Sequence, residues 1–396
     1  MNVVIVGDSQ SVNYGDPILT ECTKYLVQKL LKEKGIDVTP LVFGVLERKV
    51  KTHGERKDVN PHSPHKNSIV SKHVRELRND IRYLIKWLTN GSKAYQSRLK
   101  QSIPSDTRLI VFAGGAMFSG SVQYALAIRE IIKYADKNNI KVAFCSVGIE
   151  RSLNWRTKPI IRRLLKSDNI TAFSTRDHVE LVPHLTRNKT FYVQTPDSGL
   201  FASEAYHVPS QKEDCIGIGL ISYEAYLSVA KDEPRVRTLS RIKLYEFWKT
   251  LINQLNAKGY KWKLFTNGGT ADYRESLSFV DYLGLPREDV LSVLPDTPRM
   301  LVEQISEFSL IIGHRLHSLI VGSSFCIPVV PIVWSDKVVS FANMLETPYY
   351  WPSPEIASSM VDAIPKLLEN NKTDNKVEKL KLKSEEYISK ILKDIE

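Results

Sequence analysis

The chain of 396 residues has few cysteines, no long apolar run and no internal repeat. Its four cysteines, Cys22, Cys145, Cys215 and Cys326, are far apart, and three lie inside apolar runs. This spacing argues against a disulfide framework and against a cysteine-based zinc site. No stretch approaches the roughly 18 apolar residues that a membrane-spanning helix needs. The N-terminus reaches glycine and aspartate too early for a secretion signal and is typical of a buried strand, so we expect a cytoplasmic protein.

The basic charge is concentrated in one stretch. The chain has 55 Lys and Arg against 44 Asp and Glu, a formal net charge of +11. Residues 46–101 hold fourteen of the basic residues and five of the acidic ones, and therefore nine of the eleven excess charges. Residues 49–72 contain Pro61 and Pro64 and little apolar periodicity, which predicts a loop.

Residues 74–88 are predicted to form a basic amphipathic helix that ends at Asn90-Gly91. Apolar side chains recur at helical spacing with basic residues between them: Val74, Leu77, Ile81, Leu84, Ile85 and Leu88, with Arg75, Arg78, Arg82 and Lys86. Three interpretations stay open. The helix packs on the body with a solvated basic face, it attaches to an anionic membrane surface, or it binds nucleic acid. Nucleic acid is the least favoured, because interleaved aromatic residues and any recognised nucleic-acid module are lacking.

Apolar strand-like runs alternate with helical patterns along the whole chain, which is typical of βαβ units and parallel sheets. The expected strands are 3–6, 38–43, 109–112, 141–147, 172–174, 190–193, 215–221, 261–265, 290–293, 310–312 and 329–333. The expected helices are 16–34, 122–138, 158–165, 241–258, 278–283, 299–307 and 317–324, with a closing helix at 374–396.

The pattern restarts after residues 202–212, which are polar and lack periodicity, so we place a linker there. We predict an α/β fold of two Rossmann-like domains that face a central cleft, a GT-B-like arrangement. The first domain spans 1–205 and carries the basic insertion at about 46–105. The second spans 213–396.

Ligands of open parallel sheets bind beyond the carboxyl ends of the strands, and several loops here fall in that class. The loop after the first strand contains Asn13 and Asp16, although Asp16 is equally explained as part of a turn that caps the next helix. Gly114-Gly115 would let a ligand approach the backbone closely, and Arg176 stands between a strand and a helix. A strand-end arginine is more often a salt-bridge partner than a catalyst.

The most unusual segment is 313–318, where Arg315 and His317 lie between an apolar strand and an apolar helix. Burial of unpaired charge is costly, so we expect an anionic ligand to satisfy these cations. Lys337 follows the next strand and adds a cation on the same edge. His314 is interpreted as a packed neighbour outside the catalytic set.

Together these elements resemble the polysaccharide pyruvyl transferase family, over about residues 1–345 and in the expected order. The elements are Asn13-Tyr14-Gly15-Asp16, Gly114-Gly115, Ser174-Thr175-Arg176-Asp177, Pro196-Asp197, Arg315-Leu316-His317 and Asp336-Lys337. The Arg-Leu-His element, followed by Gly322-Ser323-Ser324-Phe325-Cys326 and then Asp336-Lys337, is the most specific. The chain departs from the pattern at Ala116, where a third glycine is common, and in the insertion at about 46–105.

The resemblance implies transfer of a pyruvyl group from phosphoenolpyruvate to two hydroxyls of a sugar, with formation of a cyclic ketal and release of phosphate. It also implies that Arg176, His317 and Lys337 bind phosphoenolpyruvate and act in the chemistry. The further substrate-binding candidates are Arg315, Leu316, Asn13, Asp16, Gly114, Gly115 and Asp197.

The residue types suit this chemistry. An arginine can donate two parallel hydrogen bonds to a carboxylate or phosphate, and a lysine can pair with phosphate as a compact positive charge. His317, with an unperturbed pKa near 6.5, is the expected acid for the methylene carbon, and Asp16 or Asp197 the expected base. We expect no metal and no cofactor besides the donor. The acceptor is a sugar of a cell-surface polysaccharide or of its lipid-linked precursor, and the helix at 74–88 would hold the enzyme at the membrane near it.

Two alternatives remain. A nucleotide-sugar-dependent glycosyltransferase of GT-B fold would use the same cleft and cations for a diphosphate, although no clear acidic ribose-binding motif follows the glycine-rich turns of the second domain. A binding protein that has lost activity would keep the cleft, but the intact cations argue against it.

Overall fold

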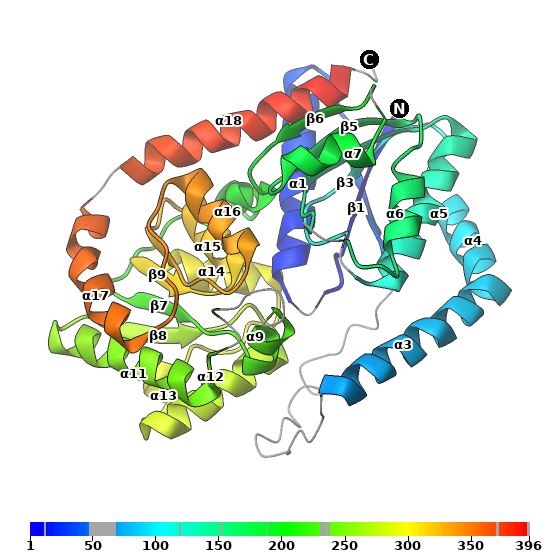
Figure 1. Cartoon of the computed structure of the whole chain (residues 1–396). Coiled ribbons are helices and arrows are strands. Elements are labelled where there is room, and N and C mark those ends of the chain that lie inside the picture. The colour runs from blue at the N-terminus through cyan, green and yellow to red at the C-terminus, as the bar shows by residue number, and fades with distance from the viewer. Residues whose placement is uncertain are drawn as a thin grey trace.

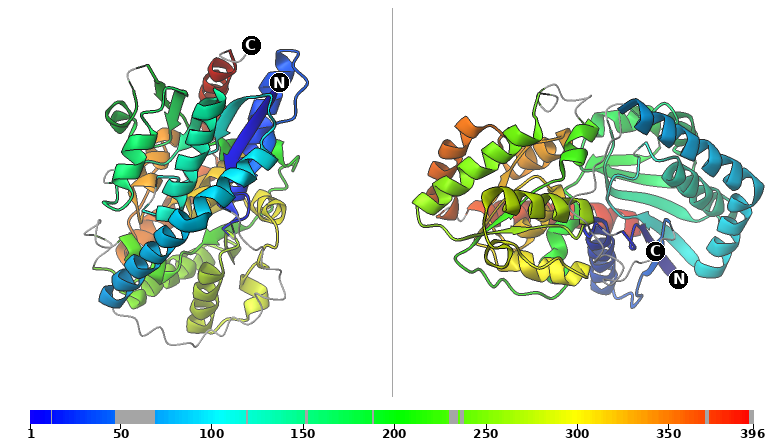
Figure 2. Two further views of the ribbon diagram at one scale, coloured as in Figure 1. Left: turned by 90° about the vertical axis from the view of Figure 1, so that its right-hand side faces the viewer. Right: turned by 90° about the horizontal axis from the view of Figure 1, so that it is seen from below.

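Two α/β units, each built on a parallel sheet, lie side by side (Figures 1 and 2). The computed structural model describes residues 1–11, 13–46, 69–118, 120–150, 153–187, 189–229, 235, 238–369 and 372–393. The predicted loop at 49–72 therefore lies outside the described residues up to 68, and its last residues begin a helix.

The first unit is a six-stranded sheet with the order β2-β1-β3-β4-β5-β6. Its strands are β1 Asn2–Gly7, β2 Leu41–Gly44, β3 Thr107–Phe112, β4 Lys141–Val147, β5 Ile170–Thr175 and β6 Phe191–Gln194. Alternate residues of β1 enter two separate apolar clusters, Val3 and Ile5 on one face and Val4 and Val6 on the other. Both faces are thus buried, which explains the uninterrupted apolar run that marks this strand in the sequence.

Helices cover both faces of this sheet. Helix α1 (Gly15–Glu33) packs on the face of Val3 and Ile5, and α5 (Val122–Asn138) supplies the cluster on the other face. The other helices are α3 Ile69–Lys86, α4 Ser92–Ser102, α6 Lys158–Leu164, α7 Val182–Leu185 and α8 Ala202–Ala205. The predicted linker at 202–212 thus begins as the short helix α8.

The second unit is a four-stranded sheet with the order β10-β9-β7-β8. Its strands are β7 Ile216–Gly219, β8 Trp262–Phe265, β9 Leu310–Gly313 and β10 Val329–Pro331. Its helices are α9 Tyr223–Val229, α11 Arg241–Ala257, α12 Thr270–Leu283, α13 Arg287–Val290, α14 Pro298–Ser306, α15 Leu316–Ser324, α16 Asp336–Leu345 and α17 Pro354–Leu368. The predicted βα alternation is confirmed in both units.

The two units share a packed boundary. Gly199, in the turn after β6, lies between Leu19 of α1 and Ile320 of α15, and a Cβ atom at this position would meet them at 3.1 and 2.9 Å. One apolar cluster continues through this contact from the first unit into the second. The closing helix α18 (Lys372–Lys393) also bridges the units (Figure 1). The hydroxyl of its Tyr387 donates to the carbonyl of Phe144 in β4 at 2.6 Å.

Two predictions of secondary structure are wrong. Residues 290–293 do not form a strand, because Val290 ends α13 and the pairing is reduced to a single bridge between Leu291 and Leu264. The basic helix does not end at Asn90-Gly91. It passes through a π-helical turn, Trp87–Gly91, and continues as α4, since Gly91 keeps helical dihedral angles.

Candidate active site

The carboxyl ends of the two sheets meet where the units join. The loop after β1 contacts the loop after β8, because the backbone N–H of Tyr14 donates to the carbonyl of Asn267 at 2.9 Å. The hydroxyl of Tyr14 also donates to the carbonyl of Asp296 at 2.5 Å. The strand-end residues that the sequence singles out in the two units are therefore brought to one place.

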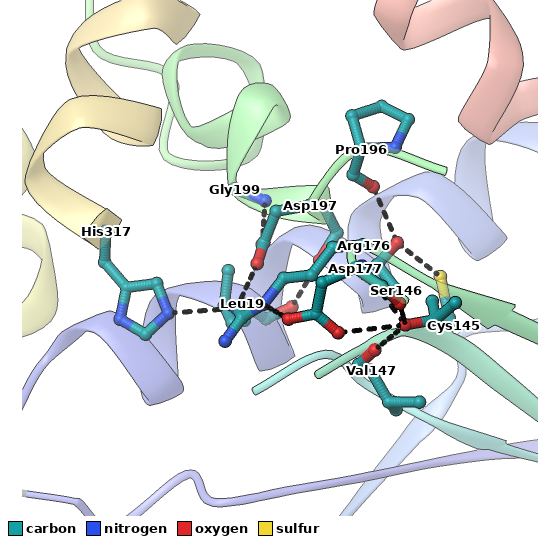
Figure 3. Close-up of polar contacts among 12 residues, drawn as sticks. Leu19, Cys145, Ser146, Val147, Arg176, Asp177, Pro196, Asp197, Gly199 and His317 are labelled. Carbon is teal, nitrogen blue, oxygen red and sulfur yellow. Dashed lines mark hydrogen bonds and ion pairs between the residues drawn. The ribbon is translucent and has the colours of Figure 1, made fainter. Parts of the chain in front are cut away.

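Arg176, directly after β5, is the central cation from the first unit. Its Nη1 donates to Oδ2 of Asp197 at 2.6 Å and lies 3.5 Å from Nε2 of His317 (Figure 3). Its Nε lies 3.9 Å from the carboxylate of Asp177 but has no hydrogen-bond partner among the described residues. The guanidinium is buried, so its orientation is set by these carboxylates.

His317, in the first turn of α15, reaches Arg176 from the second unit. Gly15 lies against the other side of the ring, where a Cβ atom would stand 1.8 Å from Nδ1. Burial lowers the pKa of His317 well below its ordinary value, and the charges of Arg176, Lys337 and Arg315 lower it further. Because Arg176 can only donate, Nε2 accepts and the imidazole is neutral in this state, contrary to the unperturbed pKa assumed from the sequence.

Arg315, the N-cap residue of α15, is not an unpaired cation as the sequence suggests. Its Nε and Nη2 donate to the two carboxylate oxygens of Asp272 at 2.6 and 2.7 Å. Asp272 is buried and also accepts from the backbone N–H of Ser222 at 2.9 Å. This bidentate pair satisfies the charge of Arg315 without a ligand, so the expectation that a ligand alone satisfies it is wrong.

Lys337 lies in the first turn of α16, the helix after β10. Its ammonium is 4.7 Å from the ring centre of Trp334, and the guanidinium of Arg315 is 5.8 Å from the same ring. Burial and the charges of Arg176 and Arg315 lower the pKa of Lys337 to about 8, although Asp16 and Asp177 act in the opposite direction. The mutual effects on pKa mean that all four predicted cationic side chains share one electrostatic environment.

Helix termini add positive potential to the same place. Neither α15 nor α16 has a side-chain cap at its N-terminus. The first N–H groups of a helix lack intrahelical partners and favour an anion. The side chain of Leu316 is buried in the core, so this predicted binding residue can contribute only its backbone. Buried polar atoms without a hydrogen-bond partner also occur in the loops of both units, at Asn13 Oδ1 and Asn267 Nδ2.

Asp16 and the predicted glycine pair lie together in the first unit. Gly115 has a φ of +103°, which side chains rarely adopt, and a Cβ atom there would lie 3.3 Å from Oδ1 of Asp16. Gly114 is packed against the carbonyl of Ser146, 3.2 Å from where its Cβ atom would be. The Asp16 side chain is partly exposed, and its charge acts on both Arg176 and Lys337.

Asp197 lies behind Arg176. It is buried, one of its oxygens accepts from Arg176, and the other accepts from the backbone N–H of Gly199 at 3.1 Å. Burial raises the pKa of this carboxyl, against the lowering effect of Arg176. With both oxygens engaged, Asp197 is placed to orient the guanidinium.

His314 is a packed residue, as predicted. Its Nδ1 lies 3.0 Å from the carbonyl of Ile332, and its ring meets Tyr226 and Trp248 edge to face. Burial lowers its pKa to about 3.

Sequence reasoning missed Asp272, Asn267 and Trp334, which stand in loops or first helical turns without a distinctive motif. Among the described residues, no group of three His, Cys, Asp or Glu side chains is arranged to hold a metal ion.

Comparison with known proteins identifies a family and a fold. The family described as polysaccharide pyruvyl transferase matches residues 13–336. No match is found among curated proteins. The fold is similar to that of UDP-GlcNAc 2-epimerase from Neisseria meningitidis bound to UDP-GlcNAc, with a TM-score of 0.55 and 10% identity over 93% of each chain. It is also similar to the S. aureus MnaA–UDP structure, with a TM-score of 0.54 and 9% identity over 95% of this chain and 90% of that one. These likenesses confirm the predicted GT-B-like α/β fold.

Proposed function

The chain belongs to the polysaccharide pyruvyl transferase family, and we propose that it moves a pyruvyl group from phosphoenolpyruvate onto two hydroxyls of a sugar, forming a cyclic ketal and releasing phosphate. The acceptor on this proposal is a sugar of a cell-surface polysaccharide or of its lipid-linked precursor. The observation that carries the proposal is the convergence of Arg176 from one unit with His317, Arg315 and Lys337 from the other.

The donor carries about three negative charges in two groups, a carboxylate and a phosphate. Arg176 offers its guanidinium charge, Lys337 offers an ammonium, and the uncapped N-termini of α15 and α16 offer backbone N–H groups. These groups come from two units and therefore suit a small ligand with charge at both ends. Asp197 and Asp272 act as positioning residues, because they hold the two guanidinium groups.

Donation of a proton from His317 to the methylene carbon makes C2 of the donor electrophilic. The first sugar hydroxyl then bonds to C2, and the C2–O bond to phosphate breaks. The second hydroxyl bonds to C2 and closes the ring. The two sugar hydroxyls lose two protons. One of them returns to His317, which gave its proton to the methylene carbon, and the other leaves with phosphate, so the overall reaction balances. Asp16, partly exposed beside Arg176 and Lys337, is the base that receives a hydroxyl proton.

His317 is neutral in the empty site, so the donor itself must bring about its protonation. Arg176, Lys337 and Arg315 disfavour the imidazolium, and a bound trianion offsets their effect. Binding of the donor thus raises the pKa of His317 and supplies the acid where it is used.

The test incubates the purified full chain with phosphoenolpyruvate and a panel of galactosides and N-acetylmannosaminides. We expect phosphate release that depends on the acceptor, together with a product that carries the pyruvyl ketal in its mass spectrum. His317→Ala should abolish both, whereas the matched control His207→Ala, an exposed histidine of the loop after α8, should keep them.

The competing function is that of a nucleotide-sugar-dependent glycosyltransferase, which the GT-B-like fold also accommodates. Turnover with UDP- or GDP-sugars and none with phosphoenolpyruvate would refute the pyruvyl transfer. Calorimetric binding of phosphoenolpyruvate without turnover on any acceptor would favour a binding protein that lacks activity.

A further inference from the structure

Helix α3 and the π-helical turn that continues it expose an apolar stripe. Leu77, Ile81 and Ile85 of α3 and Leu88 of the turn follow one another at spacings of three and four residues, so they share one side of the helix. Their exposed fractions are 41, 49, 59 and 76%. Large aliphatic side chains clustered on a surface mark an interaction site more often than scattered ones do.

The opposite side of α3 is held against the first unit. Trp87 is buried, Tyr83 stacks on it with ring centres 5.6 Å apart, and Tyr95 of α4 lies 5.5 Å away on the other side. Asp80 accepts from Nη1 of Arg156 at 2.5 Å. These contacts fix the rotation of the helix. The interpretation that the helix packs on the body therefore holds for this side, where Leu84 also packs, whereas Leu77, Ile81, Ile85 and Leu88 are exposed.

Basic side chains line one edge of the exposed stripe. Arg78, Arg82 and Lys86 are spaced by four residues and are exposed. None of the three forms an ion pair with another described residue. The side of the helix that faces outward thus combines aliphatic side chains with an adjacent row of positive charge.

An exposed tryptophan lies on the other side of this helix. Trp155 is 74% exposed, and its neighbour Arg156 pairs with Asp80 on the side of α3 that is held against the first unit. Tryptophan is enriched where proteins meet the headgroup region of a bilayer. Figures 1 and 2 show α3 along the outer side of the first unit, with its C-terminal end far from the second unit.

We propose that α3 is a docking surface for a membrane that contains anionic lipid. The helix lies in the plane of the interface, its aliphatic stripe enters the acyl boundary, and the basic row meets the headgroups. Charge complementarity favours this occupant over a second copy of the chain, whose corresponding surface would carry the same positive charge. No described helix is both long and apolar enough to span a bilayer, so the contact is peripheral. The proposal does not depend on the catalytic function.

The first test measures flotation of the full chain with vesicles of phosphatidylcholine containing about a third phosphatidylglycerol. We expect binding to these vesicles, little binding to pure phosphatidylcholine, and loss of binding as salt is raised. Each basic residue near such a surface contributes about fivefold in partitioning, so removal of three should weaken binding about 100-fold. The variant is Arg78→Gln with Arg82→Gln and Lys86→Gln, and its matched control is Lys243→Gln with Lys366→Gln and Lys383→Gln, three exposed lysines of the second unit and α18.

The second test separates the apolar contribution from the charge. Ile81→Ser with Ile85→Ser should also lose vesicle binding, whereas Ile242→Ser, 69% exposed on α11, should keep it. Circular dichroism and the melting temperature check that each variant is folded. Binding that survives both sets of substitutions overturns the proposal. So does a wild-type chain that fails to float and forms a dimer in light scattering which Ile81→Ser with Ile85→Ser dissociates, because the stripe would then be a subunit interface.

Discussion

The affinity for phosphoenolpyruvate should fall at least about tenfold for each pH unit above pH 8. The lowered pKa of Lys337, about 8, means that its amine is mostly uncharged above that pH in the empty site. Binding of the donor then requires uptake of a proton, and one pH unit corresponds to a factor of ten in affinity. The ionisation of the donor does not contribute to this trend, because its phosphate is already fully ionised above about pH 7. Between pH 7 and pH 9 Lys337 alone should therefore raise the dissociation constant about tenfold, and the proton that His317 takes up on donor binding adds to this rise.

Isothermal titration calorimetry tests this directly. Titrations at pH 8.5 in two buffers of different ionisation enthalpy should give an uptake of about 0.75 proton per donor at Lys337, as a group with a pKa near 8 requires, and up to one more at His317. Lys337→Arg should remove the contribution of Lys337 to the uptake and to the trend, since arginine stays charged throughout. A dissociation constant that does not change over this range in the wild type, without proton uptake, would refute the reasoning.

The same shift affects the stability of the empty protein with the opposite sign. Between the pKa of about 8 in the folded state and the ordinary value of 10.5, the unfolded chain binds more protons at Lys337 than the folded chain does. The free energy of unfolding should therefore gain from this group as the pH rises from 8 to 10.5. Below pH 8, where Lys337 is charged, the donor should bind most tightly, and there the buried charge of Lys337 should lower the stability of the empty protein most.

Three further predictions concern single contacts. Gly15→Ala should lower acceptor-dependent phosphate release by about 100-fold with little change in melting temperature, because the new Cβ atom would stand 1.8 Å from Nδ1 of His317 and displace the ring; activity within threefold of the wild type would contradict this. Asp272→Asn should raise the KM for the donor more than it lowers kcat, since Arg315 loses its bidentate partner, and an unchanged KM would count against its positioning role. Tyr387→Phe should lower the melting temperature by about 1–2 °C, through loss of one buried hydrogen bond of about 1 kcal/mol, and leave donor binding in calorimetry as it is; a larger effect on binding than on melting would refute it.

The alternation of apolar runs and helical patterns predicted most of the fold, because strands that are buried on both faces leave an uninterrupted signal. The strand predicted at 290–293 is wrong, because an apolar run alone does not show that a segment joins the sheet. This run lies beside the edge strand β8 and pairs with it only through Leu291. The predicted end of the basic helix at Asn90-Gly91 failed because Trp87 and Tyr95 anchor both sides of the turn in the core, and this burial outweighs the cost of a glycine in a helix.

The identity of the site cations could be predicted from the sequence, but their partners could not. Asp272 precedes Arg315 by 43 residues and lies in a helix whose first turn has no distinguishing motif. Its pairing depends on how β8 and β9 are placed in the sheet, with β7 between them. Whether the apolar stripe of α3 is buried or exposed could not be predicted either. A helical repeat shows that one side of a helix is apolar, but it does not show whether another part of the protein covers that side.

The pairing of the arginines changes how the site selects its ligand. Asp197 and Asp272 hold the guanidinium groups of Arg176 and Arg315 in place and offset part of their charge. On the proposed function, attraction of the donor then depends strongly on Lys337 and on the helix termini, and the pKa of Lys337 is lowered to about 8. On the proposed mechanism, His317 becomes an acid only when a ligand brings enough negative charge to offset three nearby cations. A ligand with a single negative charge would fill the site without protonating His317, so the charge of the donor, as much as its shape, decides whether the proton is transferred.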